Sequence, residues 1–182
     1  MKIFEKAKVH FQSNLPFVLY AKPNDNQLNA YFQHDNILHE FENQSGFVFV
    51  SFDGAKRVIL PENKSVYFSE EIALDINIDV KVVEIQTSNQ EKNQFENLVT
   101  NSVKEIKTGA FEKLVVSRKI DFSTEINLFK TYQKLIGTYK SAFRYLFFHP
   151  KIGIWIGATP EQLLKIESNQ FETVALAGTQ LY

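Results

Sequence analysis

Two charged side chains lie in apolar segments, where acid–base chemistry is best supported. Lys113 lies within FEKLVVSR, residues 111–118, and Glu161 follows a proline in GATPEQLL, residues 157–164. A lysine acts as a general base near neutral pH only when burial or neighbouring cations favour its neutral form. A glutamic acid acts as a general acid only when an apolar setting favours its protonated form. The two segments therefore suggest a base and an acid, provided that the fold supplies such surroundings.

Each candidate residue also has an ordinary structural explanation. A lysine inside an apolar strand, such as Lys113, is usually an edge charge whose aliphatic stem lies on the surface. A glutamate that follows a proline, such as Glu161, often occupies the first turn of a helix, where the helix dipole favours it. The small residues Ala177, Gly178 and Thr179 resemble a common turn. Taken one at a time, these residues do not establish a catalytic site.

The elements that would position Glu161 are predicted as strands. Residues 144–148 and 153–157 are aromatic and β-branched, a pattern that predicts two buried strands. Pro160 lacks an amide donor and has a fixed φ angle, so the second strand should end there. Glu161 is therefore expected on a tight turn directly after a buried strand.

A helix and a strand should position Lys113. Ser88 and Glu91 are spaced as a capping box, and apolar residues recur at helical spacing after them until Gly109. Apolar residues then alternate over residues 111–122, which predicts the strand that carries Lys113.

The remaining downstream segments predict a second helix and a hairpin. Ser123 or Thr124 could cap the helix, which should end near Gly137. The hairpin is predicted over residues 164–176, with its turn at Ser-Asn-Gln. It should lead into the loop of residues 177–179.

The N-terminal part of the chain predicts a short helix followed by strands. The helix is expected over residues 2–11. Strands are expected over residues 16–20, 28–32, 46–52 and 56–60. The pair Asp53-Gly54 predicts a two-residue hairpin turn between the last two strands. An antiparallel meander should therefore fill this part of the chain.

Composition supports an α+β fold. The chain contains 17 Phe and 7 Tyr, and aromatic residues at that density favour β-rich packing over a helical bundle. We expect a mostly antiparallel sheet with a few packed helices. Residues 71–85 alternate acidic and apolar side chains, as in an edge strand or a connector. We interpret this segment as the seam between two regions, residues 1–86 and residues 87–182.

Composition also limits the class of partner. With 20 basic and 21 acidic residues, the formal net charge is -1, which gives no field suited to nucleic acid or an anionic membrane. Cys is absent, which excludes disulfides and thiolate metal sites, and the N-terminus lacks a signal-like apolar run. A cytoplasmic location is therefore expected. His34 and His39 match neither helical nor strand ligand spacing, so we expect no metal site within this chain.

Taken in order, three segments resemble the successive motifs of a known family. FEKLVVSR, GATPEQLL and LAGT, the last at residues 176–179, are similar to motifs of chorismate-utilising enzymes. The specific resemblance is to isochorismate synthases of the menaquinone or siderophore type, and it extends from about residue 90 to residue 182. Three motifs in register are more specific than any one of them. The resemblance implies chorismate as the substrate.

The resemblance implies a role for each candidate residue. Lys113 matches the general base that activates water for attack on C2 of chorismate. Glu161 matches the general acid that protonates the departing C4 hydroxyl. Backbone groups of Ala177, Gly178 and Thr179 would help hold a substrate carboxylate. The resemblance further implies Mg²⁺ as the cofactor of the complete enzyme.

Enzymes of this family are longer than this chain, which ends shortly after the third motif. The glutamates that bind Mg²⁺ and the residues that clamp the substrate would lie in the remaining part. We therefore expect the chain to be an N-terminal portion of a larger enzyme and to be inactive on its own. Gln180 occupies the position where relatives often have Arg, so any contact that this Arg makes in relatives is not expected in this chain.

Three other functions stay open on the sequence alone. Salicylate synthases share the Lys and the Glu and add a pyruvate-eliminating step. Anthranilate synthases carry other residues at the Lys position and use ammonia, so Lys113 favours the branch that uses water. The third is a non-catalytic interaction domain, in which residues 46–60 or the last hairpin pair with a partner chain or a second copy through an exposed sheet edge.

Overall fold

The chain folds as two compact units. A computed structural model describes residues 2–72, 88–121, 123 and 125–174. One unit comprises Met1–Ile78 with Asn127–Tyr182, and the other comprises Asp79–Ile126. The predicted α+β class with a mostly antiparallel sheet is confirmed, because the described residues form three α-helices and strands that pair antiparallel. Within these residues, no helix is both long and apolar enough to cross a membrane.

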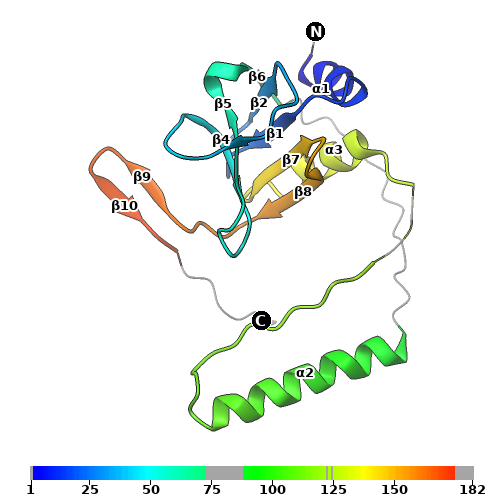
Figure 1. The fold of residues 1–182 in the computed structure, drawn as a ribbon, viewed down its shortest axis with the longest axis vertical. Helices are drawn as coiled ribbons and strands as arrows, with labels where there is room; N and C mark the ends of the chain where they lie inside the picture. The colour runs from blue at the N-terminus through cyan, green and yellow to red at the C-terminus, as the bar shows by residue number, and fades with distance from the viewer. Residues whose placement is uncertain (1, 73–87, 122, 124, 175–182) are drawn as a thin grey trace. The chain divides into compact units, whose positions relative to one another are not determined.

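A five-stranded antiparallel sheet forms the centre of the first unit (Figure 1). Its strand order is β6-β2-β1-β7-β8. The bounds are β1 (Phe17–Ala21), β2 (Gln27–Gln33), β6 (Ser65–Glu71), β7 (Phe143–His149) and β8 (Gly153–Thr159). In β1, Leu19 lies opposite Ala30 of β2 on one side and opposite Leu146 of β7 on the other. Strands far apart in the sequence thus share one sheet, and β8 leads directly to Glu161.

Two helices, α1 (Ile3–Gln12) and α3 (Leu128–Thr138), cover one face of this sheet (Figure 1). The buried residues shared by the helices and the sheet are Ile3, Ala7, Phe17, Leu19, Leu28, Ala30, Phe32, Tyr132, Ile136, Leu146 and Phe148. The ring of Phe17 lies 5.8 Å from that of Phe148 and 6.3 Å from that of Phe129. Burial of one such side chain contributes roughly 1.5–3 kcal/mol. This layer therefore holds β7, the support of β8, firmly in place.

A smaller sheet covers the other face of the central strands. It has the order β3-β5-β4 and consists of β3 (His39–Glu40), β4 (Gly46–Val50) and β5 (Arg57–Pro61). A short 3₁₀ helix, η1 (Glu62–Lys64), links β5 to β6. Val18 and Phe147 of the large sheet pack against Val58 and Leu60, and the rings of Phe49 and Phe147 stack at 4.6 Å. Because β1 and β7 are covered on both faces, their sequences are nearly continuous apolar runs.

Most predicted elements of the first unit are confirmed. The helix expected over residues 2–11 is α1, and the four expected N-terminal strands are β1, β2, β4 and β5. The prediction of one meander is wrong, because β5 pairs with β3 and with β4 in a separate three-stranded sheet. Strand β6 was not predicted, although its residues SVYFSEE carry an alternating, half-exposed edge pattern.

The turn between β4 and β5 differs from the prediction. Val50 pairs with Arg57, so residues 51–56 form the loop instead of a two-residue turn at Asp53-Gly54. The Ser51 N–H donates to the Lys56 carbonyl oxygen at 2.9 Å, and the Ser51 hydroxyl donates to the Asp53 carboxylate. These side-chain and backbone hydrogen bonds stabilise a wider loop, in which Gly54 still supplies a positive φ of 70°.

The described residues of the second unit form one helix followed by an extended segment. Helix α2 (Asn89–Lys107) begins as predicted, because Ser88 accepts from the Glu91 N–H and Glu91 accepts from the Ser88 N–H. The strand predicted over residues 111–122 is wrong for the part that the structure describes, where residues 111–121 are extended but unpaired. A strand is stabilised by hydrogen bonds to a neighbouring strand. Alternation of apolar residues gives no information on whether such a neighbour exists.

Two further boundaries can be compared with their predictions. Asn127, instead of Ser123 or Thr124, caps α3, because its side chain accepts from the Lys130 N–H at 3.1 Å. Thr124 lies outside the described residues. So does most of the predicted seam, and the division into residues 1–86 and 87–182 stays a prediction.

The buried ring of His149 makes the first unit sensitive to acid. Nδ1 accepts the Lys151 N–H at 3.1 Å, so the neutral ring carries its proton on Nε2, which lies 3.4 Å from the Ile37 carbonyl oxygen. Burial lowers the pKa of His149 below its ordinary value, and burial likewise lowers the pKa of His10. The unfolded chain therefore binds more protons than the folded chain below about pH 6.5. The contribution of the two histidines to the free energy of unfolding should be fully present above that pH. It should decrease as the pH drops toward their pKa values in the folded chain.

Urea unfolding at a series of pH values checks this prediction. We expect His149→Gln to reduce the loss of stability between pH 7 and pH 5, because one of the two rings whose pKa is lowered no longer titrates. His34→Gln, at an exposed ring, is the matched control and should change the acid dependence less than His149→Gln does. An undiminished acid dependence in the His149 variant would show that this ring is not the group responsible.

Candidate functional site

The end of strand β8 presents Glu161. β8 pairs with β7 in a register that places Thr159 opposite Phe143 and Gly157 opposite Tyr145. The strand ends at Thr159, directly before Pro160, as the missing amide of proline predicted. Glu161 follows with an exposed side chain. Among the described residues of the first unit, the Glu161 side chain is therefore accessible to solvent.

The prediction of two buried strands is right for β7 and wrong for β8. Phe147 of β7 is fully buried, whereas Trp155 of β8 remains 50% exposed. The difference arises because β8 is an edge strand of the described sheet, with β7 on one side only. The Trp155 ring contacts Phe49 of the small sheet at 5.5 Å and leaves half of its surface free.

A close contact between β7 and β8 depends on Gly157. A Cβ atom at this position would lie 2.6 Å from the ring of Tyr145, so any side chain here would require that ring to move. The absence of a side chain therefore lets the Tyr145 ring lie over the backbone of β8. Burial of this ring raises the pKa of Tyr145. The Gly of the GATPE motif thus has a packing role two residues before Thr159.

A hydrogen-bonded turn follows the strand. The Glu161 N–H donates to Thr159 Oγ1 at 3.2 Å, and that hydroxyl lies 3.4 Å from the Glu161 carbonyl oxygen. Pro160 between them has a fixed φ angle. The turn fixes where the Glu161 backbone lies relative to the end of β8.

The hairpin predicted after Glu161 is present in the described residues. It consists of β9 (Lys165–Glu167) and β10 (Gln170–Glu172), and Ser168 adopts a positive φ of 53° at the turn. Beyond β10, the Val174 N–H donates to the Gln162 carbonyl oxygen at 3.2 Å. The predicted substrate-binding residues Ala177, Gly178 and Thr179 lie outside the described residues.

Lys113 belongs to the second unit and lies in its extended segment. Its side chain is exposed, as are those of the apolar neighbours Leu114 and Val115. The described residues of this unit therefore do not bury the ammonium group. Because Lys113 and Glu161 lie in different units, their predicted roles as base and acid stay predictions.

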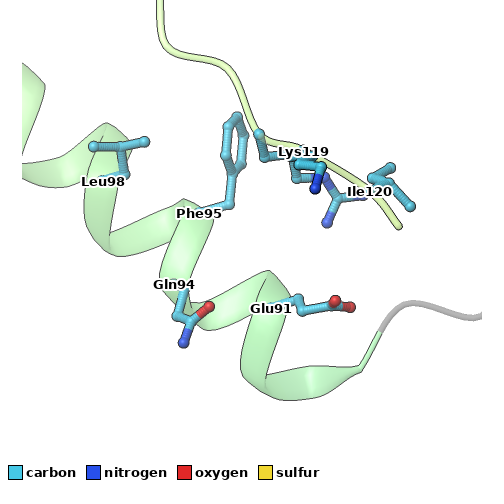
Figure 2. Close-up of a pocket in the computed structure, with 7 residues that line it drawn as sticks. Glu91, Gln94, Phe95, Leu98, Lys119 and Ile120 are labelled. Atoms are coloured by element: carbon cyan, nitrogen blue, oxygen red, sulfur yellow. The ribbon is translucent and has the colours of Figure 1, made fainter. Parts of the chain in front are cut away.

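A small open pocket lies between α2 and the extended segment (Figure 2). It has a volume of about 230 Å³ and is lined by Glu91, Gln94, Phe95, Leu98, Arg118, Lys119 and Ile120. The guanidinium of Arg118 lies 6.0 Å from the ring centroid of Phe95, within the range of a cation–π contact. Glu91 is already engaged in capping α2. This contact was not predicted from the sequence, although Arg118 ends the FEKLVVSR motif.

No described set of side chains fits a metal ion. Within residues 2–72, 88–121, 123 and 125–174, no group of three or more His, Asp or Glu side chains gathers closely enough to hold one. The Mg²⁺ that the resemblance implies therefore finds no ligand set among these residues.

Comparisons with known proteins give two matches. The family described as "Chorismate binding enzyme" matches residues 57–181. The anthranilate synthase component 1 of Aeropyrum pernix is 31% identical over 88 residues, which cover 47% of this chain and 19% of that protein. The matched segment thus spans about a fifth of the length of the curated relative. No solved structure gives a significant match.

Proposed function

The chain belongs to the chorismate-binding enzyme family, and on this premise we propose that the protein containing it is an isochorismate synthase. The observation that carries the proposal is Lys113 within FEKLVVSR, in a chain that also has Glu161 in GATPE. Lysine is the residue expected where water, instead of ammonia, must be activated. In the proposal, the complete enzyme is the protein that contains both this chain and the remainder of the catalytic domain.

In the proposed reaction, one water molecule enters and one leaves. Neutral Lys113 accepts a proton from water as the water oxygen bonds to C2 of chorismate. Both ring double bonds shift, from C1=C2 to C1=C6 and from C5=C6 to C4=C5, and the C4–O bond breaks. Protonated Glu161 donates its proton to the departing oxygen, which leaves as water. General acid and base groups of this kind each contribute about 10²- to 10⁴-fold to a rate.

The proposal places further groups around these two residues. Backbone N–H groups of Ala177, Gly178 and Thr179 would hold a substrate carboxylate, since backbone amides bind anions without a counter-charge. Mg²⁺, if bound by the rest of the complete enzyme, would neutralise carboxylate charge of the substrate. The described residues form no site for it, so we assign it no ligand here.

Anthranilate synthesis is the main alternative, because the curated relative is an anthranilate synthase component. In that reaction ammonia, not water, would add to the ring. Salicylate synthesis would follow the same first step and then eliminate pyruvate. Lys113 favours water over ammonia, but it does not separate isochorismate from salicylate.

Analysis of the reaction products tests the proposal. The complete enzyme is incubated with chorismate and Mg²⁺, with and without ammonium, and the products are separated by chromatography. We expect isochorismate in both conditions and no anthranilate in either. Anthranilate formed only when ammonium is present would overturn the proposal, and salicylate with pyruvate would assign the salicylate branch. We expect the 182-residue chain alone to give no product.

A further inference from the structure

We propose that Thr159 is a positioning residue for Glu161: its hydroxyl ties the backbone that carries the carboxylate to the end of strand β8. This inference rests on the proposed function only in that Glu161 is there the general acid. The contact itself is present in the chain regardless of which reaction the complete enzyme performs.

The Thr159 hydroxyl bridges over Pro160 to both polar groups of the Glu161 backbone. It accepts the Glu161 N–H at 3.2 Å and can donate to the Glu161 carbonyl oxygen at 3.4 Å. A hydroxyl has one donor and two acceptor sites, so it can make both contacts at once. Such local side-chain contacts replace the hydrogen bonds that a strand or helix would provide.

Thr159, which makes these hydrogen bonds, is itself held in place by the sheet. Thr159 is the last residue of β8 and pairs with Phe143, which begins β7. The next residue of β7, Arg144, is buried and bonded to three backbone carbonyl groups. Pro160 fixes its own φ and restricts Thr159 to an extended conformation. The direction in which Glu161 leaves the backbone is therefore set by the sheet.

A purely structural role for the hydroxyl is a poor explanation of this contact. Thr159 is exposed and contributes to neither core cluster. Loss of its hydroxyl should therefore leave the midpoint of unfolding nearly unchanged. What it should change is the freedom of Glu161, and misplacement of a catalytic group by about 1 Å can lower a rate about 10²-fold.

Amide hydrogen exchange in the 182-residue chain tests the tie directly. Thr159→Val keeps the shape of the side chain and removes the hydroxyl. We expect it to speed exchange of the Glu161 amide about fivefold after correction for intrinsic rates, the effect of one net hydrogen bond. Thr159→Ser should keep the slow exchange. Thr173→Val is the matched control. It removes a hydroxyl that donates to the Leu163 carbonyl oxygen and not to the Glu161 backbone, so exchange of the Glu161 amide should stay slow.

Kinetics of the complete enzyme provide the second readout. Thr159→Val should lower kcat about tenfold to a hundredfold with KM little changed, and Thr159→Ser should restore kcat. Unchanged exchange of the Glu161 amide in the valine variant would overturn the proposal, as would equal losses of kcat in the valine and serine variants. If Glu161→Gln is fully active, the proposed function fails, while the exchange experiment still decides whether Thr159 positions Glu161.

Discussion

Glu161→Gln in the complete enzyme is expected to abolish isochorismate formation while the fold stays intact. The amide has nearly the same shape as the carboxyl group but has no acidic proton to give to the departing C4 hydroxyl. Lys113→Gln should have a comparable effect, because it removes the group that accepts a proton from water. Each loss should be about 10²-fold or more, the usual contribution of a general acid or base. Steady-state rates with chorismate and circular dichroism of the folded variants provide the measurement.

Two matched substitutions control for a general effect of charge. Glu167→Gln removes an exposed carboxylate from β9, where it pairs with Lys165 at 3.0 Å. Lys104→Gln removes an exposed ammonium from the last part of α2. Both controls should keep near-normal rates. Near-normal rates in Glu161→Gln or in Lys113→Gln would instead remove that residue from the proposed mechanism.

Arg144→Met is expected to destabilise the first unit strongly. Arg144 is 1% exposed, and its guanidinium donates to the carbonyl oxygens of Ile136 at 3.2 Å, Lys22 at 2.6 Å and Asp25 at 3.2 Å. It therefore ties the end of α3 to the connection between β1 and β2. Methionine fills much of the space but donates no hydrogen bond, so all three are lost, and a hydrogen bond from a charged group contributes about 1.5–3 kcal/mol.

Urea unfolding of the 182-residue chain measures this effect. We expect the free energy of unfolding to fall by about 3 kcal/mol or more, a large share of the stability of a typical domain. Arg144→Lys should lose less, because its ammonium can still bond some of the carbonyl groups. Arg57→Met, at an exposed arginine that donates to the Gly54 carbonyl oxygen, is the control and should stay within about 0.5 kcal/mol of the parent. An equally small change in Arg144→Met would contradict this account.

Local patterns predicted most single elements of the fold. The capping box at Ser88 and Glu91 identified the start of α2, and Pro160 identified the end of β8. These features work because they depend on hydrogen bonds and dihedral angles of a few adjacent residues. The α+β class could be predicted for the same reason, since aromatic and β-branched runs specify strands wherever they occur.

Relations between distant segments could not be predicted in this way. The pairing of β1 with β7 joins residues more than a hundred positions apart, and the sequence of neither strand indicates which strand it will pair with. Because strand partners are not encoded locally, the strand was wrongly predicted over residues 111–121, and the exposed edge position of β8 was not predicted. In the candidate site, the sequence motifs singled out Glu161 and Lys113. The hydrogen bond between Thr159 and Glu161 and the packing of Tyr145 on Gly157 were visible only in the three-dimensional structure.

The source of the new hydroxyl group tests the central claim most directly. The complete enzyme is incubated with chorismate and Mg²⁺ in water enriched in ¹⁸O, and the product is analysed by mass spectrometry with assignment of the labelled carbon. Our account predicts isochorismate that carries one ¹⁸O atom at C2, because the C2 oxygen comes from solvent and the C4 oxygen leaves. Unlabelled isochorismate, or anthranilate in place of isochorismate, would contradict it.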